Sequence, residues 1–195
     1  MVLNSLGFVL ARAGSKRLPN KNITPLQSNK DIVELAIEKC VANGIRVVLS
    51  TDILKHMQEF HDRSGVLLVP RPEHLCGDAV DPVDVILDVL QSFIELPEYI
   101  VLMQPTSPCW DFKDLLWAMK KVQHENAPGM FSVNPAFKPN GCFYIARTRD
   151  FIEQHSLFLE GSYVYVMDWK ESIDIDNLWD FRVAQAELDG RVLRN

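Results

Sequence analysis

The sequence lacks the features that mark several large classes of protein. Its 20 Lys and Arg residues are outnumbered by 26 Asp and Glu, so its net charge is −6. This balance argues against nucleic acid or an anionic membrane as the main partner, because both reward basic surfaces. No apolar run approaches the roughly 18 residues of a membrane span. No N-terminal basic region followed by a long apolar run marks a signal peptide, and we expect a cytoplasmic protein.

Patterns for disulfides, zinc and the common nucleotide-binding loops are missing too. The five histidines show no ligand spacing such as HxxxH, and neither GxxxxGK[ST] nor GxGxxG occurs. The four cysteines are widely spaced and form no CxxC pair: Cys40, Cys76, Cys109 and Cys142. Free thiols in a reducing compartment are therefore the simplest interpretation.

Short apolar runs alternate with amphipathic segments over the first two thirds of the chain. The apolar runs predict strands at 6–11, 46–50, 66–69 and 99–103. The segments between or after them predict helices at 31–43, 53–63, 82–94 and 112–124. Later segments predict strands at 130–133, 142–146 and 163–167 and a closing helix at 177–188. Strands separated by helices favour a single α/β domain over residues 1–195, a three-layer α/β/α structure with a mostly parallel sheet.

The loop after the first predicted strand is the strongest candidate for an anion site. Residues 11–22 read ARAGSKRLPNKN, in which Gly14 and Ser15 allow close backbone approach to a ligand. The loop carries four cations in ten residues: Arg12, Lys16, Arg17 and Lys21. A solvated basic loop is the alternative, but α/β proteins bind ligands at the carboxyl ends of strands. This position favours phosphate binding.

Two carboxylates near the C-terminus are the candidate metal ligands. Asp174 and Asp176 alternate with Ile173 and Ile175, and a strand with this alternation would place both carboxylates on one face. Mg²⁺ prefers one or two carboxylates together with phosphate oxygens and water. The alternative is a polar strand face that leads into a helix cap, a common role for carboxylates at that position.

Polar side chains also follow the predicted strand 99–103, in the segment QPTSP. The amide of Gln104 and the hydroxyls of Thr106 and Ser107 can hydrogen-bond sugar oxygens. A rigid turn between two prolines is an equally good interpretation. Asp52 follows the strand 46–50, and we expect it to cap the next helix rather than to order the site.

Six segments in order along the chain resemble the acylneuraminate cytidylyltransferases, the family of CMP-sialic acid synthetases. They are LARAGSKRLPNKN, STD at 50–52, RPEHLCGD at 71–78, QPTSP at 104–108, KPNGCFYI at 138–145 and SIDID at 172–176. The resemblance implies a nucleotide-diphospho-sugar transferase-like fold and an Mg²⁺-dependent enzyme. Such an enzyme moves CMP from CTP to an acidic nonulosonic sugar and releases pyrophosphate.

The resemblance also implies roles for individual residues. Arg12, Lys21 and Asp176 would be catalytic, Gln104 would meet the sugar with Thr106 and Ser107, and Asp174 would share the metal with Asp176. The nucleotide would be held by Arg12, Ser15, Lys16, Lys21, Asn22, Arg71 and Asp78. In-line attack on the α-phosphorus depends mainly on positioning and charge neutralisation, which these cations and the metal would supply.

Two departures from the family pattern bear on this expectation. Relatives usually carry small hydroxyl residues after the aspartate of RPxxLxxD, where this chain has Ala79, Val80, Asp81 and Pro82. Relatives also carry a long excursion that reaches a partner subunit, where residues 134–138 alone join two strands here. A homodimer would therefore be weaker than in relatives or built differently. The alternatives are a CMP-Kdo synthetase-like enzyme and a non-catalytic nucleotide-binding relative.

Overall fold

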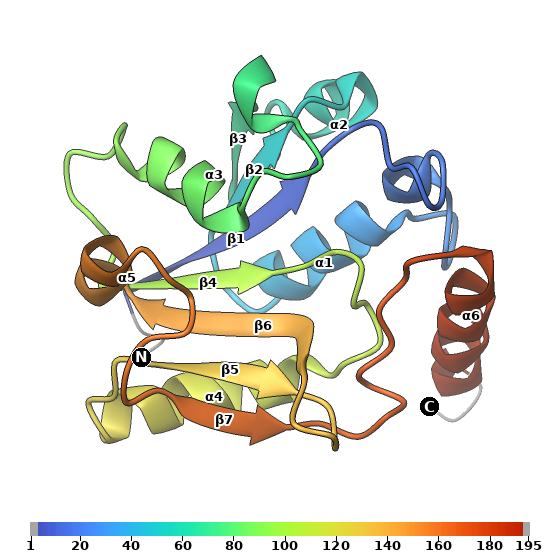
Figure 1. The fold of residues 1–195 in the computed structure, drawn as a ribbon. Coiled ribbons are helices and arrows are strands. Elements are labelled where there is room, and N and C mark those ends of the chain that lie inside the picture. The colour runs from blue at the N-terminus through green and yellow to red at the C-terminus, as the bar shows by residue number, and fades with distance from the viewer. Residues whose placement is uncertain (1–3, 193–195) are drawn as a thin grey trace.

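The computed structural model describes residues 4–192, and a seven-stranded sheet runs through its centre (Figure 1). The strand order is β3-β2-β1-β4-β6-β5-β7. β6 is antiparallel to β4 and β5, while the other strand pairs are parallel. The strands are β1 (Ser5–Ala11), β2 (Val47–Thr51), β3 (Val66–Pro70), β4 (Tyr99–Met103), β5 (Gly129–Val133), β6 (Pro139–Arg147) and β7 (Tyr163–Val166). The predicted mostly parallel sheet is confirmed.

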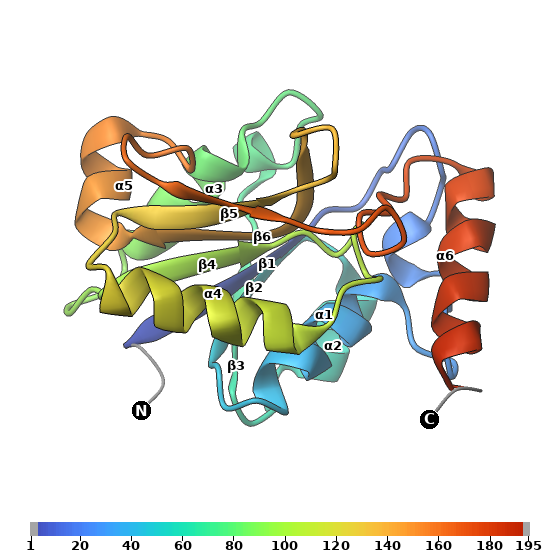
Figure 2. The ribbon, with the colours of Figure 1, turned by 90° about the horizontal axis from the view of Figure 1, so that it is seen from below.

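Six α-helices accompany the sheet in the described part of the chain. They are α1 (Ile32–Val41), α2 (Leu54–Phe60), α3 (Pro82–Leu90), α4 (Phe112–His124), α5 (Thr148–Gln154) and α6 (Leu178–Val192). Figure 2 shows α1, α2 and α4 on one face and α3 and α5 on the other, with α6 beside one end. The predicted three layers are thus confirmed. Within residues 4–192, no helix is both long and apolar enough to cross a bilayer.

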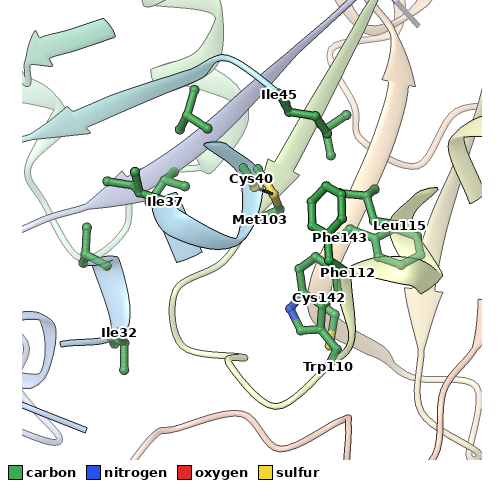
Figure 3. Close-up of a cluster of buried hydrophobic side chains, with 14 of the residues drawn as sticks. Ile32, Ile37, Cys40, Ile45, Met103, Trp110, Phe112, Leu115, Cys142 and Phe143 are labelled. Atoms are coloured by element: carbon green, nitrogen blue, oxygen red, sulfur yellow. Dashed lines mark hydrogen bonds between the residues drawn. The ribbon is translucent and has the colours of Figure 1, made fainter. Parts of the chain in front are cut away.

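Alternation along the strands builds a separate core on each face of the sheet. In β1, Val9 and Ala11 pack toward the face with α1 and α4, whereas Leu6 and Phe8 pack toward the face with α3 and α5. Figure 3 shows part of the larger cluster, in which side chains of α1 and α4 meet residues of β4 and β6. Burial of both strand faces explains the continuous apolar runs in the sequence.

The cysteines lie within this framework as free thiols, as predicted. Cys40, Cys109 and Cys142 are buried, and the Cys40 sulfur lies 2.8 Å from the Met103 sulfur. Desolvation raises the pKa of Cys40 to about 12 and also raises the pKa of Cys142. These thiols therefore stay protonated and serve the core as small apolar side chains.

The first helix begins at a buried polar network that sequence reasoning did not anticipate. The Asp31 carboxylate caps α1 by accepting from the N–H groups of Val33 and Glu34. Its second oxygen, Oδ2, lies 2.8 Å from Lys55 Nζ and 2.9 Å from His56 Nε2. Asp31 and His56 are both fully buried, so this carboxylate ties α2 to the start of α1.

We expect this network to make the protein sensitive to acid. Burial alone would raise the pKa of Asp31, but hydrogen bonds from His56 and Lys55 outweigh burial and lower the pKa to about 2. A lowered carboxyl pKa contributes stability that is present above its unfolded value of 3.8 and is lost as pH falls through about 2. That contribution is about 2 kcal/mol of unfolding free energy, from about 1.4 kcal/mol per pKa unit.

Urea unfolding measured from pH 6 down to pH 2 checks this expectation. The free energy of unfolding should fall more steeply below pH 4 in the native sequence than in Asp31→Asn, which has no carboxyl to titrate. Equal slopes for the two proteins would contradict the assignment of this acid sensitivity to Asp31.

Candidate functional site

A cleft of about 320 Å³ opens at the carboxyl ends of β1 and β4. The loop after β1, the loop after β4 and the segment before α6 contribute to it, and all three lie at the same end of the sheet (Figure 1). Sites in parallel sheets are expected at this edge. The predicted site residues that line it are Arg12, Ser15, Lys21, Asn22, Arg71, Gln104, Thr106, Asp174 and Asp176.

Hydrogen bonds to Asp52 and from Asn22, at the end of the loop, hold the basic loop in shape. Asp52 follows β2, and its carboxylate accepts a hydrogen bond of 2.6 Å from the Ala13 N–H. The Asn22 side chain donates to the Arg12 carbonyl oxygen at 2.9 Å, while Gly14 takes a positive φ of 74°. The prediction that Asp52 caps the next helix is wrong, because the N-cap of α2 is Ile53 and no side-chain hydrogen bond caps the helix.

The loop cations contact protein acceptors at the rim of the cleft. Arg17 pairs with Asp176 at 2.5 Å, and Lys21 Nζ donates to the Ile175 carbonyl oxygen at 2.6 Å. Arg17 belongs to the predicted cationic run, but the sequence predicts no separate role for it. These two contacts join the N-terminal loop to the C-terminal carboxylate segment, which lies more than 150 residues away in the sequence.

Two predicted nucleotide ligands are absent from the cleft lining. The Lys16 side chain is 82% exposed, and Arg12 and Lys16 both form ion pairs with Asp78. In this structure Asp78 therefore pairs with two of the four cations of the basic loop. Its pairing with Lys16, reinforced by Arg12, lowers the pKa of Asp78.

Charges that face the cleft are incompletely solvated. Burial lowers the pKa of Lys21, although Asp174 and Asp176 act in the opposite direction. Although Asp174 is exposed to solvent at the cleft, desolvation by the surrounding protein raises its pKa, and the nearby charge of Asp176 adds to this effect. A bound cation would favour the charged form of both carboxylates, and bound phosphates would favour the charged form of Lys21.

The segment 172–176 is not a strand, contrary to the prediction from its alternation. Ile175 is nevertheless buried, and its N–H donates to the Thr106 carbonyl oxygen at 2.8 Å, so the segment is held by the loop after β4. The start of α6 is capped by Asn177 and Asp180. Asn177 and Asp180 therefore serve as the helix caps, a role that the sequence left open for Asp174 and Asp176. Asp174 and Asp176 line the cleft instead.

The two carboxylates fit a divalent cation that is shared with a triphosphate. Among residues 4–192, no group of three or more His, Cys, Asp or Glu side chains could hold a metal ion alone. Mg²⁺ commonly takes one or two carboxylates and completes its shell with phosphate oxygens and water. Asp174 and Asp176 supply such a pair on either side of Ile175, whose carbonyl oxygen accepts from Lys21, and this pair suits an ion that arrives with the nucleotide.

The loop after β4 brings two of its three predicted sugar ligands to the cleft. Gln104 and Thr106 line it, but Ser107 is buried and its hydroxyl donates to the Asn140 carbonyl oxygen at 2.8 Å. Ser107 is therefore a structural residue of the turn here. The hydroxyl pattern alone could not distinguish a side chain that faces the cleft from one that faces the core.

Apolar side chains also line the cleft. Arg71 lines it too, and its guanidinium donates to the Ser50 carbonyl oxygen at 2.9 Å. Burial lowers the pKa of Arg71, which lies close to the Asp52 carboxylate. Apolar walls with a few polar groups are typical of small-molecule sites. The apolar lining residues are Leu10, Val80, Pro82, Val85 and Leu102.

The short join between β5 and β6 is a closed turn. The Asn134 carboxamide oxygen accepts from the N–H groups of Ala136 and Lys138, and the Asn134 N–H donates to the Lys138 carbonyl oxygen. Phe137 takes a positive φ of 57° and projects into solvent. The turn is thus complete within five residues.

Comparison with known proteins connects this chain to a family. Residues 6–158 match the family model described as Cytidylyltransferase. An N-acylneuraminate cytidylyltransferase of Streptococcus agalactiae is 26% identical over 211 residues, covering 89% of this chain and 51% of that protein. The chain therefore spans about half the length of this curated relative.

A second relative matches over nearly its whole length. A CMP-N,N'-diacetyllegionaminic acid synthase of Legionella pneumophila is 28% identical over 225 residues, covering 94% of this chain and 96% of that protein. A solved CMP:2-keto-3-deoxy-manno-octonic acid synthetase in complex with CTP has a TM-score of 0.73 at 14% identity. It covers 96% of this chain and 99% of that one, and it shows that the fold is shared.

Proposed function

The chain belongs to the cytidylyltransferase family, and from this premise we propose that it moves CMP from CTP to an acidic nonulosonic sugar with release of pyrophosphate. The observation that carries the proposal is the juxtaposition in one cleft of Lys21, Asp174 and Gln104. Phosphate, metal and sugar ligands would thus meet where the transfer takes place. The named relatives act on sugars of the proposed class.

Each side of the cleft has a distinct task in this proposal. Arg12 and Lys21 bind the triphosphate and neutralise the charge that develops on pyrophosphate as it leaves, with Ser15 and Asn22 beside them. Gln104 and Thr106 hold sugar hydroxyls so that the anomeric oxygen lies in line with the α-phosphorus. Arg71 and the apolar wall receive the cytidine.

Mg²⁺ is the proposed metal, and Asp174 and Asp176 are its proposed ligands. When bound, the ion neutralises phosphate charge and helps to orient the triphosphate. The contribution of the chain is to keep both carboxylates at the cleft, since capping of α6 is left to Asn177 and Asp180. The free cysteines also support the proposal that the protein acts in the cytoplasm.

The closed 134–138 turn favours a second candidate, a binding protein that retains CTP binding but has lost the transfer activity.

A homodimer of this chain would have to form through surfaces other than an arm at this turn. Light scattering at several protein concentrations would measure the oligomeric state. A protein that remains monomeric throughout would contradict a homodimer.

Pyrophosphate release in the presence of CTP, Mg²⁺ and a panel of acidic sugars tests the function. We expect release that requires one nonulosonic acid and CTP, and much less with UTP or ATP. Release with the eight-carbon acid Kdo in place of nine-carbon sugars would instead identify a CMP-Kdo synthetase. CTP binding without release for any sugar would support the non-catalytic candidate and contradict transfer.

A further inference from the structure

A buried asparagine outside the cleft connects the two segments that carry the proposed sugar and metal ligands. Asn140 stands near the start of β6 and is 5% exposed. Its carboxamide oxygen accepts a 2.6 Å hydrogen bond from the Ser132 hydroxyl of β5, and its Nδ2 donates to the Ser172 hydroxyl at 2.9 Å. The side chain thus anchors the segment 172–176 to the sheet.

The backbone at the same position holds the loop after β4. The Asn140 carbonyl oxygen accepts from the Ser107 hydroxyl at 2.8 Å, and the Gly141 carbonyl oxygen accepts from the Gln104 N–H at 3.1 Å. Gly141 has a φ of 77°, and a Cβ there would collide with the Gln104 carboxamide and lie 2.7 Å from the Ser107 hydroxyl. A glycine is needed for this close approach.

These hydrogen bonds form one closed network. Ser172 stands two residues before Asp174, and the Ile175 N–H donates to the Thr106 carbonyl oxygen at 2.8 Å. The loop after β4 is therefore attached to the carboxylate segment directly and also through residues 140–141. Buried polar networks in which each member is bonded are rigid and specify one arrangement.

We propose that Asn140 is a positioning residue that sets the separation between the Gln104–Thr106 loop and the Asp174–Asp176 pair. Asn140 does not line the cleft. Its side chain acts through Ser172, and its carbonyl oxygen acts through Ser107. The inference rests on the proposed function. A shift of about 1 Å in a catalytic group can cost roughly 100-fold in rate, so the network governs turnover even though it touches no substrate.

Ser172→Ala is the sharpest test, because it removes one bond of the network at a half-buried position. We expect kcat/KM for the sugar to fall about 10- to 100-fold, a loss of the size that misplaced catalytic groups cause. Binding of CTP without metal should stay within about threefold, a change smaller than one hydrogen bond typically contributes. Ser172→Thr keeps the hydroxyl and should restore most of the lost turnover.

Ser92→Ala is the matched control, since it removes a 2.7 Å hydroxyl bond to the Val89 carbonyl oxygen at the far end of α3. Asn140→Ala should lower kcat/KM at least as much as Ser172→Ala, because it also removes the bond from Ser132, and the double variant should add little to Asn140→Ala, as expected for partners in one bond. If Asn140→Ala does not fold, the Ser172 variants alone decide. Sugar parameters of Ser172→Ala that match those of Ser92→Ala would overturn the proposal.

A separate readout distinguishes failure of this inference from failure of the proposed function. Absence of pyrophosphate release in the native protein with every sugar contradicts the transfer reaction. Hydrogen exchange of the Ile175 amide and Mn²⁺ affinity in the presence of CTP then test the positioning role. Faster exchange and weaker Mn²⁺ binding in Ser172→Ala support it, and no change in exchange overturns it.

Discussion

Replacing Asp176 by Asn is expected to reduce metal-dependent pyrophosphate release by about 100- to 1,000-fold, the loss typical when one electrostatic contact to a transition state is removed. The substitution keeps the shape of the side chain and removes its charge. Asp176 borders the cleft and contacts the exposed Arg17 side chain, so folding should not depend on it. Surface ion pairs of this kind contribute about 0–1 kcal/mol to stability.

The assay is initial-rate pyrophosphate release over a range of Mg²⁺ concentrations, with thermal unfolding measured in parallel. Asp189→Asn is the control, since it removes an exposed carboxylate of α6 that does not line the cleft. Asp176→Asn should show both a lower kcat and a weaker dependence on Mg²⁺, at a nearly unchanged melting temperature. Native turnover in Asp176→Asn would remove this residue from the metal site.

Much of the fold follows from apolar periodicity, and particular elements show why. Residues 99–103 and 112–124 were predicted with the bounds that β4 and α4 have. β4 is buried on both faces, and α4 begins at the Asp111 cap, so each leaves a strong local signal. The sequence does not predict α5, because this helix follows β6 directly and no side-chain cap marks its start.

Other errors arise where tertiary contacts decide between equal local patterns. The alternation in 172–176 is the same for a strand and for an extended loop, and Ile175 is held by one bond to Thr106 instead of by a neighbouring strand. The predicted helix 82–94 ends as α3 at Leu90, and Ile94 is fully exposed. Its apolar side chain extends the predicted helix beyond the residues that pack on the sheet.

The candidate site shows the same limit at the level of single side chains. Resemblance and strand-end position located the basic loop, the QPTSP turn and the carboxylate pair, and the structure brings residues from all three to one cleft. Whether Ser107 or Thr106 faces that cleft depends on Asn140, which lies more than 30 residues further along the chain. The role of Asp52 could not be predicted from the sequence either, since its partner is the Ala13 N–H of a distant loop.

Lys21 and Lys16 offer a matched pair of cations for testing which side of the basic loop meets the triphosphate. Lys21 is partly desolvated and borders the cleft, whereas Lys16 points to solvent and pairs with Asp78. A hydrogen bond to a charged group contributes about 1.5–3 kcal/mol, so Lys21→Ala should weaken CTP binding by about 10- to 150-fold. Lys16→Ala should weaken it by less than about fivefold, as exposed charge contacts do.

Titration calorimetry with CTP and Mg²⁺ at two salt concentrations measures both variants. The Lys16 contribution should fade at high salt, because exposed charges are screened, while the Lys21 contribution should persist in its partly buried position. Loss of affinity in Lys16→Ala that equals or exceeds the loss in Lys21→Ala would reverse the assignment. In that case the basic loop must change conformation when CTP binds. Lys16 would then break its ion pair with Asp78 and contact the phosphates.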